Sequence, residues 1–181
     1  MNIVYYSHTG NTEHFVKEHL IPQMKLHPVK IDGDNPRGLI EGPAPIRALS
    51  VGGPHQALSH TDAPLQPGHT LLVFPIYARA DHETGETFDT VPEPIQDIIA
   101  LLDQAGRKPL AAISVGNRTF GGAYGKVNAD ELFGVPHLGT VEMSGTKEEA
   151  LEMVHRFNDL AQDLDFDANT GLDPYHPDLN N

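Results

Sequence analysis

Five apolar runs recur along the chain, and apolar residues return every three or four positions in the stretches between them. The runs at 70–77 and 110–115 are apolar almost throughout. This continuous pattern is typical of strands that are covered on both faces of a parallel sheet. It predicts five strands, at residues 3–6, 28–32, 70–77, 110–115 and 137–143.

Helices are predicted between these strands from apolar positions at helical spacing. They span 13–20, the stretch from near Pro92 to Gly106, a weakly helical 123–133, and a final segment that begins at Thr146. Thr146 and Glu149 have the spacing of a capping box, in which each side chain accepts the backbone N–H of the other residue. The apolar stripes are Ile95, Ile98, Ile99 and Leu102 in the second helix, and Ala150, Met153, Val154, Phe157, Ala161 and Leu164 in the last.

This alternation predicts an α/β fold with a doubly wound, five-stranded parallel sheet in three layers. The length of 181 residues suits one domain, which we place at 1–164. Residues 33–68 contain six prolines, and only 48–51 have strand character, so we expect a surface insertion there. Residues 165–181 are acidic, without a basic residue, and we expect a mobile tail.

Composition narrows the function classes. The net charge of −13 repels nucleic acid and anionic lipid, and it suits a protein that meets other proteins electrostatically or that gains only solubility from its charge. The absence of cysteine excludes disulfides, thiol catalysis and thiolate metal sites. No stretch is apolar enough to span a membrane, and a strand beginning at residue 2 or 3 leaves no room for a signal peptide, so we expect a cytoplasmic protein.

The candidate chemistry begins where the first strand meets the first helix. Three hydroxyl residues surround Gly10 there, and no lysine or arginine precedes Lys17. Free amides at a helix start, together with hydroxyls, bind phosphate without a cation. Residues 7–12 resemble the flavodoxin signature (Ser/Thr)-x-Thr-Gly-x-Thr, which binds the phosphate of FMN. The alternative is a ligand-free turn in which Asn11 or Thr12 caps the helix.

Three predicted loops lie at the carboxyl ends of strands, which is where doubly wound sheets bind ligands. They are residues 7–12, 77–90 and 116–122, and all three are loops that a flavodoxin uses. We call them the first turn, the second loop and the third loop.

The third loop narrows the family. Residues 114–125, SVGNRTFGGAYG, resemble the SGNRNFGEAYG segment of the NrdI family, the flavodoxin-like accessory proteins of class Ib ribonucleotide reductase. Residues 90–95, TVPEPI, are similar to the family's VPEPV or VPRQV, and residues 142–146, EMSGT, to its ELSGT. The resemblance covers about 1–32 and 70–164.

The resemblance implies a mechanism. Reduced FMN gives electrons to O2, and the superoxide formed reaches the dimanganese site of the reductase small subunit and helps to generate its radical. A flavin reductant must supply the electrons. The protein itself would supply no acid, base, nucleophile or metal ligand, because the flavin performs the chemistry.

The resemblance also implies which residues bind FMN. Arg118 could instead pair with an acidic neighbour, and Tyr124 could serve packing alone. The implied set is Ser7, His8, Thr9, Gly10, Asn11 and Thr12 for the phosphate, Tyr77 and Phe120 for the ring faces, Asn117, Arg118 and Thr119 for the polar edge of the ring, and Ala78, Phe88, Gly121 and Tyr124 beside them.

The second loop departs from the family. NrdI proteins usually have a short glycine-rich loop here, whereas this chain has a longer acidic one in which only Gly85 remains. The peptide flip that glycine permits near the flavin is therefore in doubt. We expect the acidic side chains Asp81, Glu83, Glu86 and Asp89 to lower the reduction potential of a bound flavin, because negative charge disfavours its anionic reduced form.

Other readings stay open. A general flavodoxin that shuttles electrons would share the first turn, and a flavin-free binding module would explain the altered second loop. Metal binding is disfavoured because no histidine pair has the i, i+4 spacing of a helical zinc site. The run from Asp165 is similar to a calcium loop, but its glycine is one position late and His176 stands where glutamate is needed.

Overall fold

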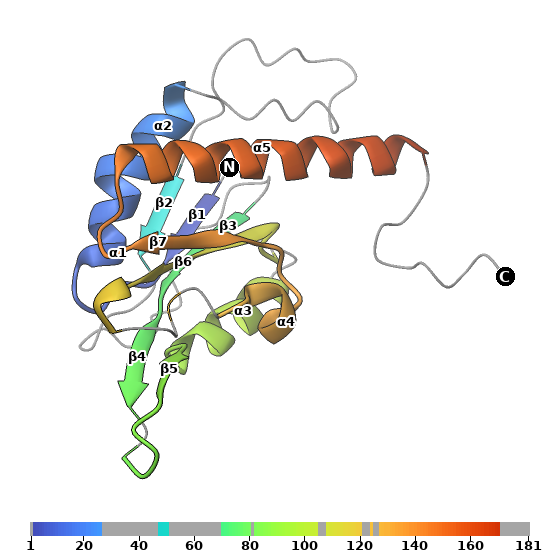
Figure 1. Ribbon diagram of the computed structural model, residues 1–181. Helices are drawn as coiled ribbons and strands as arrows, with labels where there is room; N and C mark the ends of the chain where they lie inside the picture. The colour runs from blue at the N-terminus through green and yellow to red at the C-terminus, as the bar shows by residue number, and fades with distance from the viewer. Residues whose placement is uncertain are drawn as a thin grey trace, which may run out of the picture.

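A parallel sheet of five strands forms the centre of the molecule (Figure 1). The computed structural model describes residues 2–26, 47–50, 70–80, 82–104, 108–120, 124 and 127–170. The strands are β1 (Asn2–Tyr5), β2 (Arg47–Ser50), β3 (Thr70–Pro75), β6 (Ala111–Gly116) and β7 (His137–Glu142). Their order, β2-β1-β3-β6-β7, is that of flavodoxin-like folds and confirms the predicted fold class.

The edge strand β2 falls on the part of residues 33–68 that has strand character, 48–51. It pairs in parallel with β1, from Arg47 opposite Asn2 to Ser50 opposite Tyr5, and so supplies one strand of the central sheet. The rest of residues 33–68 lies outside the described residues. The strand predicted at 28–32 lies outside the described residues.

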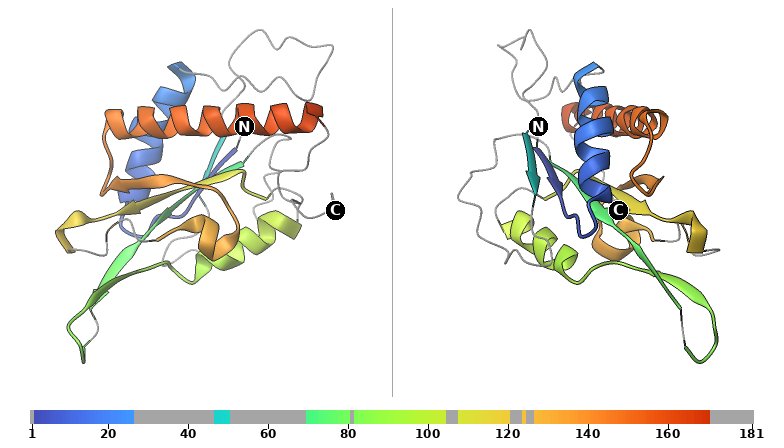
Figure 2. Two further views of the ribbon diagram at one scale, coloured as in Figure 1. Left: turned by 45° about the vertical axis from the view of Figure 1, so that its right-hand side comes forward. Right: turned by 90° about the vertical axis from the view of Figure 1, so that its left-hand side faces the viewer.

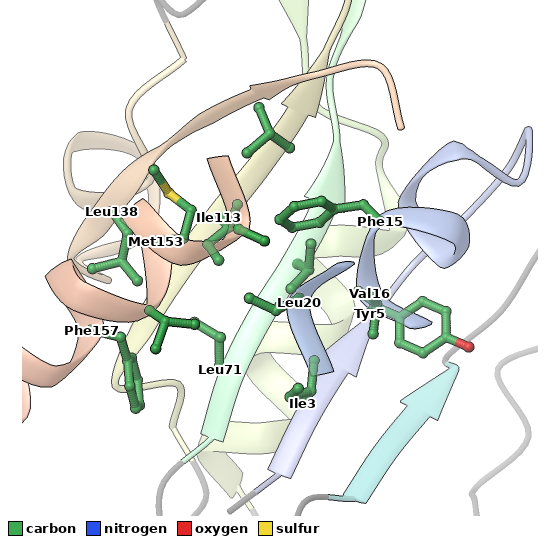
Figure 3. Packing of buried hydrophobic residues seen from close by; sticks show 14 of the residues in the cluster. Ile3, Tyr5, Phe15, Val16, Leu20, Leu71, Ile113, Leu138, Met153 and Phe157 are labelled. Carbon is green, nitrogen blue, oxygen red and sulfur yellow. The ribbon is translucent and has the colours of Figure 1, made fainter. Parts of the chain in front are cut away.

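Side chains that alternate along the strands build two separate cores, one on each face of the sheet. Ile3 and Tyr5 face one core, and Val4 and Tyr6 face the other. The first core lies under α1 (Asn11–His14), η1 (Phe15–Leu20), α2 (Ile21–Leu26) and α5 (Lys147–Thr170), and Figure 3 shows its packing. The second lies under α3 (Pro94–Gln104) and α4 (Ala129–Phe133), so the three layers are confirmed (Figure 1).

The first helix begins at Asn11, two residues before the predicted start, and its middle is π-helical. The N–H of Ile21 donates to the carbonyl of Val16, five residues earlier. The wider turn brings the rings of His14 and His19 together, with their centroids 5.4 Å apart. Among the described residues, no group of three or more potential metal ligands gathers at one place. Their helices are also too short or too polar to cross a membrane.

The stripe of α3 lies as predicted, with Ile95, Ile98 and Leu102 buried and Ile99 partly so. In α5 the predicted positions Ala150, Met153, Val154, Phe157 and Ala161 are buried, and the side chain of Leu164 lies outside the described residues. The predicted capping box is half right: the N–H of Glu149 donates to Thr146 Oγ1 at 3.2 Å. The carboxylate of Glu149 instead accepts the N–H of Glu142, at 3.1 Å. α5 continues to Thr170, so the first six residues of the predicted tail, 165–170, are helical.

The second loop, which the sequence predicts as a polar loop, forms a β-hairpin. β4 (Tyr77–Ala80) pairs antiparallel with β5 (Thr87–Thr90), and the hairpin projects from the body of the molecule (Figures 1 and 2). Thr90 Oγ1 donates to the carbonyl of Tyr77 at 3.1 Å and closes its base. Gly85, at φ 72°, provides the left-handed residue that the turn requires.

Candidate functional site

The three predicted loops leave the carboxyl ends of β1, β3 and β6, which are neighbours in the sheet. The loop after β7, residues 143–146, joins them at the same edge. In parallel sheets this edge is where ligands bind, and here the chain order reverses between β1 and β3. The topology therefore brings the predicted site residues to one end of the molecule.

The first turn is built around Gly10, which has φ 90° and ψ −18° and serves as the N-cap of the helix. The N-cap residue has no side chain, but Ser7 Oγ accepts the N–H of Glu13 at 3.2 Å, and the N–H of His14 returns to the Gly10 carbonyl at 2.9 Å. Asn11 is thus the first helical residue, and neither Asn11 nor Thr12 is the N-cap that the alternative interpretation assigned to them. Thr12 is buried, whereas His8, Thr9 and Gly10 are exposed.

The geometry of the first turn fits a phosphate group. A Cβ placed on Gly10 would meet no atom within 4 Å, so there is open space against the backbone at the helix start. The first amides of a helix lack intrahelical partners and carry partial positive charge, which attracts an anion. Lys17 does not serve this space, because it forms an ion pair with Glu13. The hydrogen bond that Lys17 donates to Glu13 within this pair is the main reason why the pKa of Lys17 is raised.

Tyr77 connects the first turn to the hairpin. Its ring lies edge-on to His8, with centroids 6.1 Å apart. Its hydroxyl oxygen is buried and has no hydrogen-bond partner among the described residues. Burial, followed by the charge of Tyr6, raises the pKa of Tyr77 to about 12, so the phenol is neutral at physiological pH. A neutral, unpartnered hydroxyl beside the first turn is consistent with a ligand that supplies the missing partner.

The hairpin places the remaining second-loop candidates on its two strands. Ala78 lies on β4 opposite Asp89, and Phe88 lies on β5 opposite Arg79. Glu83 and Glu86 are exposed where the hairpin turns.

In the third loop, the backbone amides of Arg118 and Thr119 form hydrogen bonds within the protein. Asn117 Oδ1 accepts the N–H of Thr119 at 2.8 Å. The N–H of Arg118 donates to both carboxylate oxygens of Glu142, at 3.1 and 3.0 Å. These contacts lie at the start of a short 3-10 turn, η2 (Arg118–Phe120). These two amides are therefore used inside the protein and are not offered to the polar edge of a ring.

Arg118 pairs with an acidic neighbour, the alternative considered for it. Its Nε lies 3.3 Å from Glu142 Oε2, and its guanidinium lies 5.1 Å from the ring centre of Tyr124. The Tyr124 hydroxyl donates to the carbonyl of Thr140 at 3.2 Å, and burial is the main cause of its raised pKa. Tyr124 is thus held in place by contacts within the protein. Phe120 ends η2, and Gly121 lies outside the described residues.

Sequence reasoning missed the residues that support this edge. Glu142 received no role, although it begins one of the segments on which the resemblance rests, and Glu149 was assigned only to the capping box. Gly145 has φ 67°, and a Cβ there would lie 2.3 Å from a ring carbon of Phe15, so only glycine lets this loop approach the first helix. Met143, at φ 47°, is the one non-glycine residue with positive φ in the described part of the chain.

A family model described as NrdI Flavodoxin like matches residues 3–155 of the chain. The chain belongs to the NrdI flavodoxin-like family. A relative named Protein NrdI, from Bartonella tribocorum (strain CIP 105476 / IBS 506), is 33% identical over 155 residues, which cover 82% of this chain and 87% of that protein. Membership in the NrdI family confirms the resemblance and implies the role of an accessory flavodoxin in class Ib ribonucleotide reduction.

Proposed function

We propose that this NrdI-family protein binds FMN across the first turn, the hairpin and the third loop, and that it supplies superoxide for assembling the dimanganese–radical cofactor of a class Ib ribonucleotide reductase small subunit. The observation that supports this most is the first turn. Open backbone, neutral hydroxyls and a helix start meet there without a cation. The family match supports the partner and the cytoplasmic setting.

In this proposal the residues of the chain bind and orient. The hydroxyls and amides of the first turn hold the phosphate, with Ser7 already holding one amide of the helix. The Tyr77 ring contacts one face of the flavin, and its unpartnered hydroxyl takes a polar group of the ligand. When bound, FMN supplies the electron transfer to O2.

The test uses the purified protein and a manganese-loaded class Ib small subunit. We expect a yellow protein that takes up FMN in a one-to-one ratio and, once reduced, releases superoxide with O2. Mixing reduced protein, small subunit and O2 should give the tyrosyl radical signal, and omitting the protein should abolish it. A colourless protein that does not take up FMN would favour the flavin-free module. Electron transfer to other acceptors without radical formation would favour a general flavodoxin.

The acidic hairpin gives one further expectation. Glu83 and Glu86 place negative charge on the element that follows β3. Replacing both with glutamine should raise the reduction potential of the bound flavin, because the anionic reduced form would meet less repulsion. The potential is measured by anaerobic titration, and an equal value in variant and wild type would contradict the idea.

A further inference from the structure

Glu142 is the last residue of β7, at the carboxyl edge of the sheet. Each of its polar groups makes a hydrogen bond with a neighbouring loop or helix. Both of its carboxylate oxygens accept the N–H of Arg118. Its own N–H donates to Glu149 Oε1 at 3.1 Å, and its carbonyl accepts the N–H of Gly145 at 2.6 Å. The side chain of Glu142 is 30% exposed, against 67% for Arg118, so the carboxylate is the more enclosed member of their ion pair.

Among the described residues of the third loop, few other contacts hold positions 117–120. η2 is a single 3-10 turn of three residues, and such a turn has poor internal hydrogen-bond geometry. Its start is fixed by two contacts, Asn117 Oδ1 to the N–H of Thr119 and Glu142 to the N–H of Arg118. The second contact is the stronger kind, because its acceptor is ionised.

We propose that Glu142 is a positioning residue for flavin binding: its carboxylate holds the N–H of Arg118 and thereby sets the conformation in which residues 117–119 meet the ligand. The flavin part rests on the proposed function, whereas the hold on the loop does not. Glu142 acts through the backbone of Arg118. The ion pair with the Arg118 side chain is secondary, since that side chain is mostly exposed and water screens such a pair.

Glu149 extends this arrangement into the layer of helices. Glu149 lies in the first turn of α5, where its N–H is capped by Thr146 and its carboxylate holds the N–H of Glu142. The third loop is therefore connected through Glu142 to the start of α5. Loss of the Glu149 carboxylate should loosen the loop less than loss of Glu142, because it removes the contact one step further back.

The first experiment uses the protein without FMN and measures amide hydrogen exchange at position 118. Glu142→Ala should speed exchange by about tenfold or more, as expected when a charge-assisted hydrogen bond is lost. Glu142→Gln keeps one carbonyl acceptor and should restore part of the protection. The matched control is Glu152→Gln, which changes the net charge equally but only breaks the exposed pair with Arg156. It should leave exchange unchanged.

Arg118→Ala separates the backbone contact from the ion pair. It removes the guanidinium but keeps the N–H at position 118, so slow exchange should persist. Exchange as fast as in Glu142→Ala would show that the ion pair holds the loop and would overturn the proposal. Should Glu142→Ala fail to fold, Glu142→Gln and Arg118→Ala still give this comparison.

The second experiment adds FMN. Glu142→Ala should weaken FMN binding by about tenfold, with partial recovery in Glu142→Gln and none of the loss in Glu152→Gln. The reduction potential should rise in Glu142→Gln, because a negative charge disappears beside the site. Wild-type protein that binds no FMN would refute the proposed function and leave the exchange result standing. Wild-type affinity and potential in both Glu142 variants would refute the positioning role alone.

Discussion

The first turn and the third loop lie at the same edge of the sheet, but they are completed in different ways. In the first turn, His8, Thr9 and Gly10 are exposed, and Gly10, the N-cap of the helix, has no side chain. In the third loop, the amides of Arg118 and Thr119 are both bonded within the protein. The first turn thus presents exposed groups to a ligand, whereas Arg118 and Thr119 in the third loop have their amides bonded within the protein.

The two loops differ in when the entropy of ordering them is lost, during folding or on ligand binding. A loop that bonds itself is ordered during folding, and it adds little entropy cost when a ligand binds. A loop that waits for a ligand gains its last contacts only on binding. Changes in the first turn should therefore alter ligand affinity, and changes in the third loop should alter the protein itself.

The largest effect is expected where both regions would be disturbed together. Gly145→Ala would place a Cβ 2.3 Å from the ring of Phe15, which is fully buried on the helix that follows the first turn. With the strain of φ 67°, we expect about 3 kcal/mol less unfolding free energy, measured by urea denaturation. Gly134→Ala is the matched control, because φ is 61° but the nearest atom is 3.9 Å away. Equal losses in the two variants would contradict the contact.

Thr9→Ala tests the first turn alone. Thr9 is exposed, and we expect its hydroxyl to serve the phosphate, so the variant should bind FMN about tenfold more weakly. The unfolding free energy of the flavin-free protein should stay within about 0.5 kcal/mol of the wild type. Titration calorimetry with FMN and denaturation without it measure the two effects. A loss of stability without loss of affinity would reverse the assignment.

Asn117→Ala tests the third loop in the same two ways. It removes the acceptor of the Thr119 N–H, so the flavin-free protein should lose about 1 kcal/mol. Exchange of that amide should speed up as well. The comparison between the two loops would fail if this variant kept full stability and protection without FMN.

The smallest effect is expected at β6, the strand that leads into the third loop. Ser114 Oγ lies 3.1 Å from His137 Nε2 and 2.7 Å from Thr140 Oγ1. Burial lowers the pKa of His137 below its ordinary 6.5; Arg156 adds to this, and a hydrogen bond with the Gly139 backbone opposes it.

On acidification through pH 6.5, the unfolded chain therefore takes up a proton at His137 before the folded protein does. The contribution of His137 to the unfolding free energy is complete above pH 6.5 and is lost progressively below it. Denaturation at several pH values should show a fall in stability on the acid side, and His137→Gln should flatten it. An unchanged slope in the variant would exclude His137 as the cause.

The fold was predictable to the extent that continuous apolar runs mark buried strands. β1, β3 and β6 follow such runs, whereas β7 has only the buried Leu138 and Val141 among more polar residues. β2 was not assigned to the sheet, because its four residues, RALS, lie in a proline-rich stretch whose composition suggests a loop. The hairpin was not predicted, because Arg79 and the acidic residues of the second loop leave no clear alternation of apolar and polar positions.

The first turn of the site could be predicted because its residues are consecutive, with hydroxyl residues and a glycine between a predicted strand and a predicted helix. The role of Glu142 could not be found this way, since its partner Arg118 is 24 residues away in the chain. Only the pairing of β6 with β7 brings the two together. Contacts of this kind depend on sheet register, which composition and local pattern do not determine.

The π-helical turn of the first helix fixes the rotational phase of everything that follows it. Phe15 and Leu20 are five residues apart, and both are fully buried in the same core, as a wider turn permits. Because the wider turn takes up one extra residue, deleting one residue here would return the stretch to regular α-helical winding and leave the phase of the distal segment nearly unchanged. Gln23 and Met24 would then stay enclosed. A change of one residue in chain length is thus absorbed within this turn.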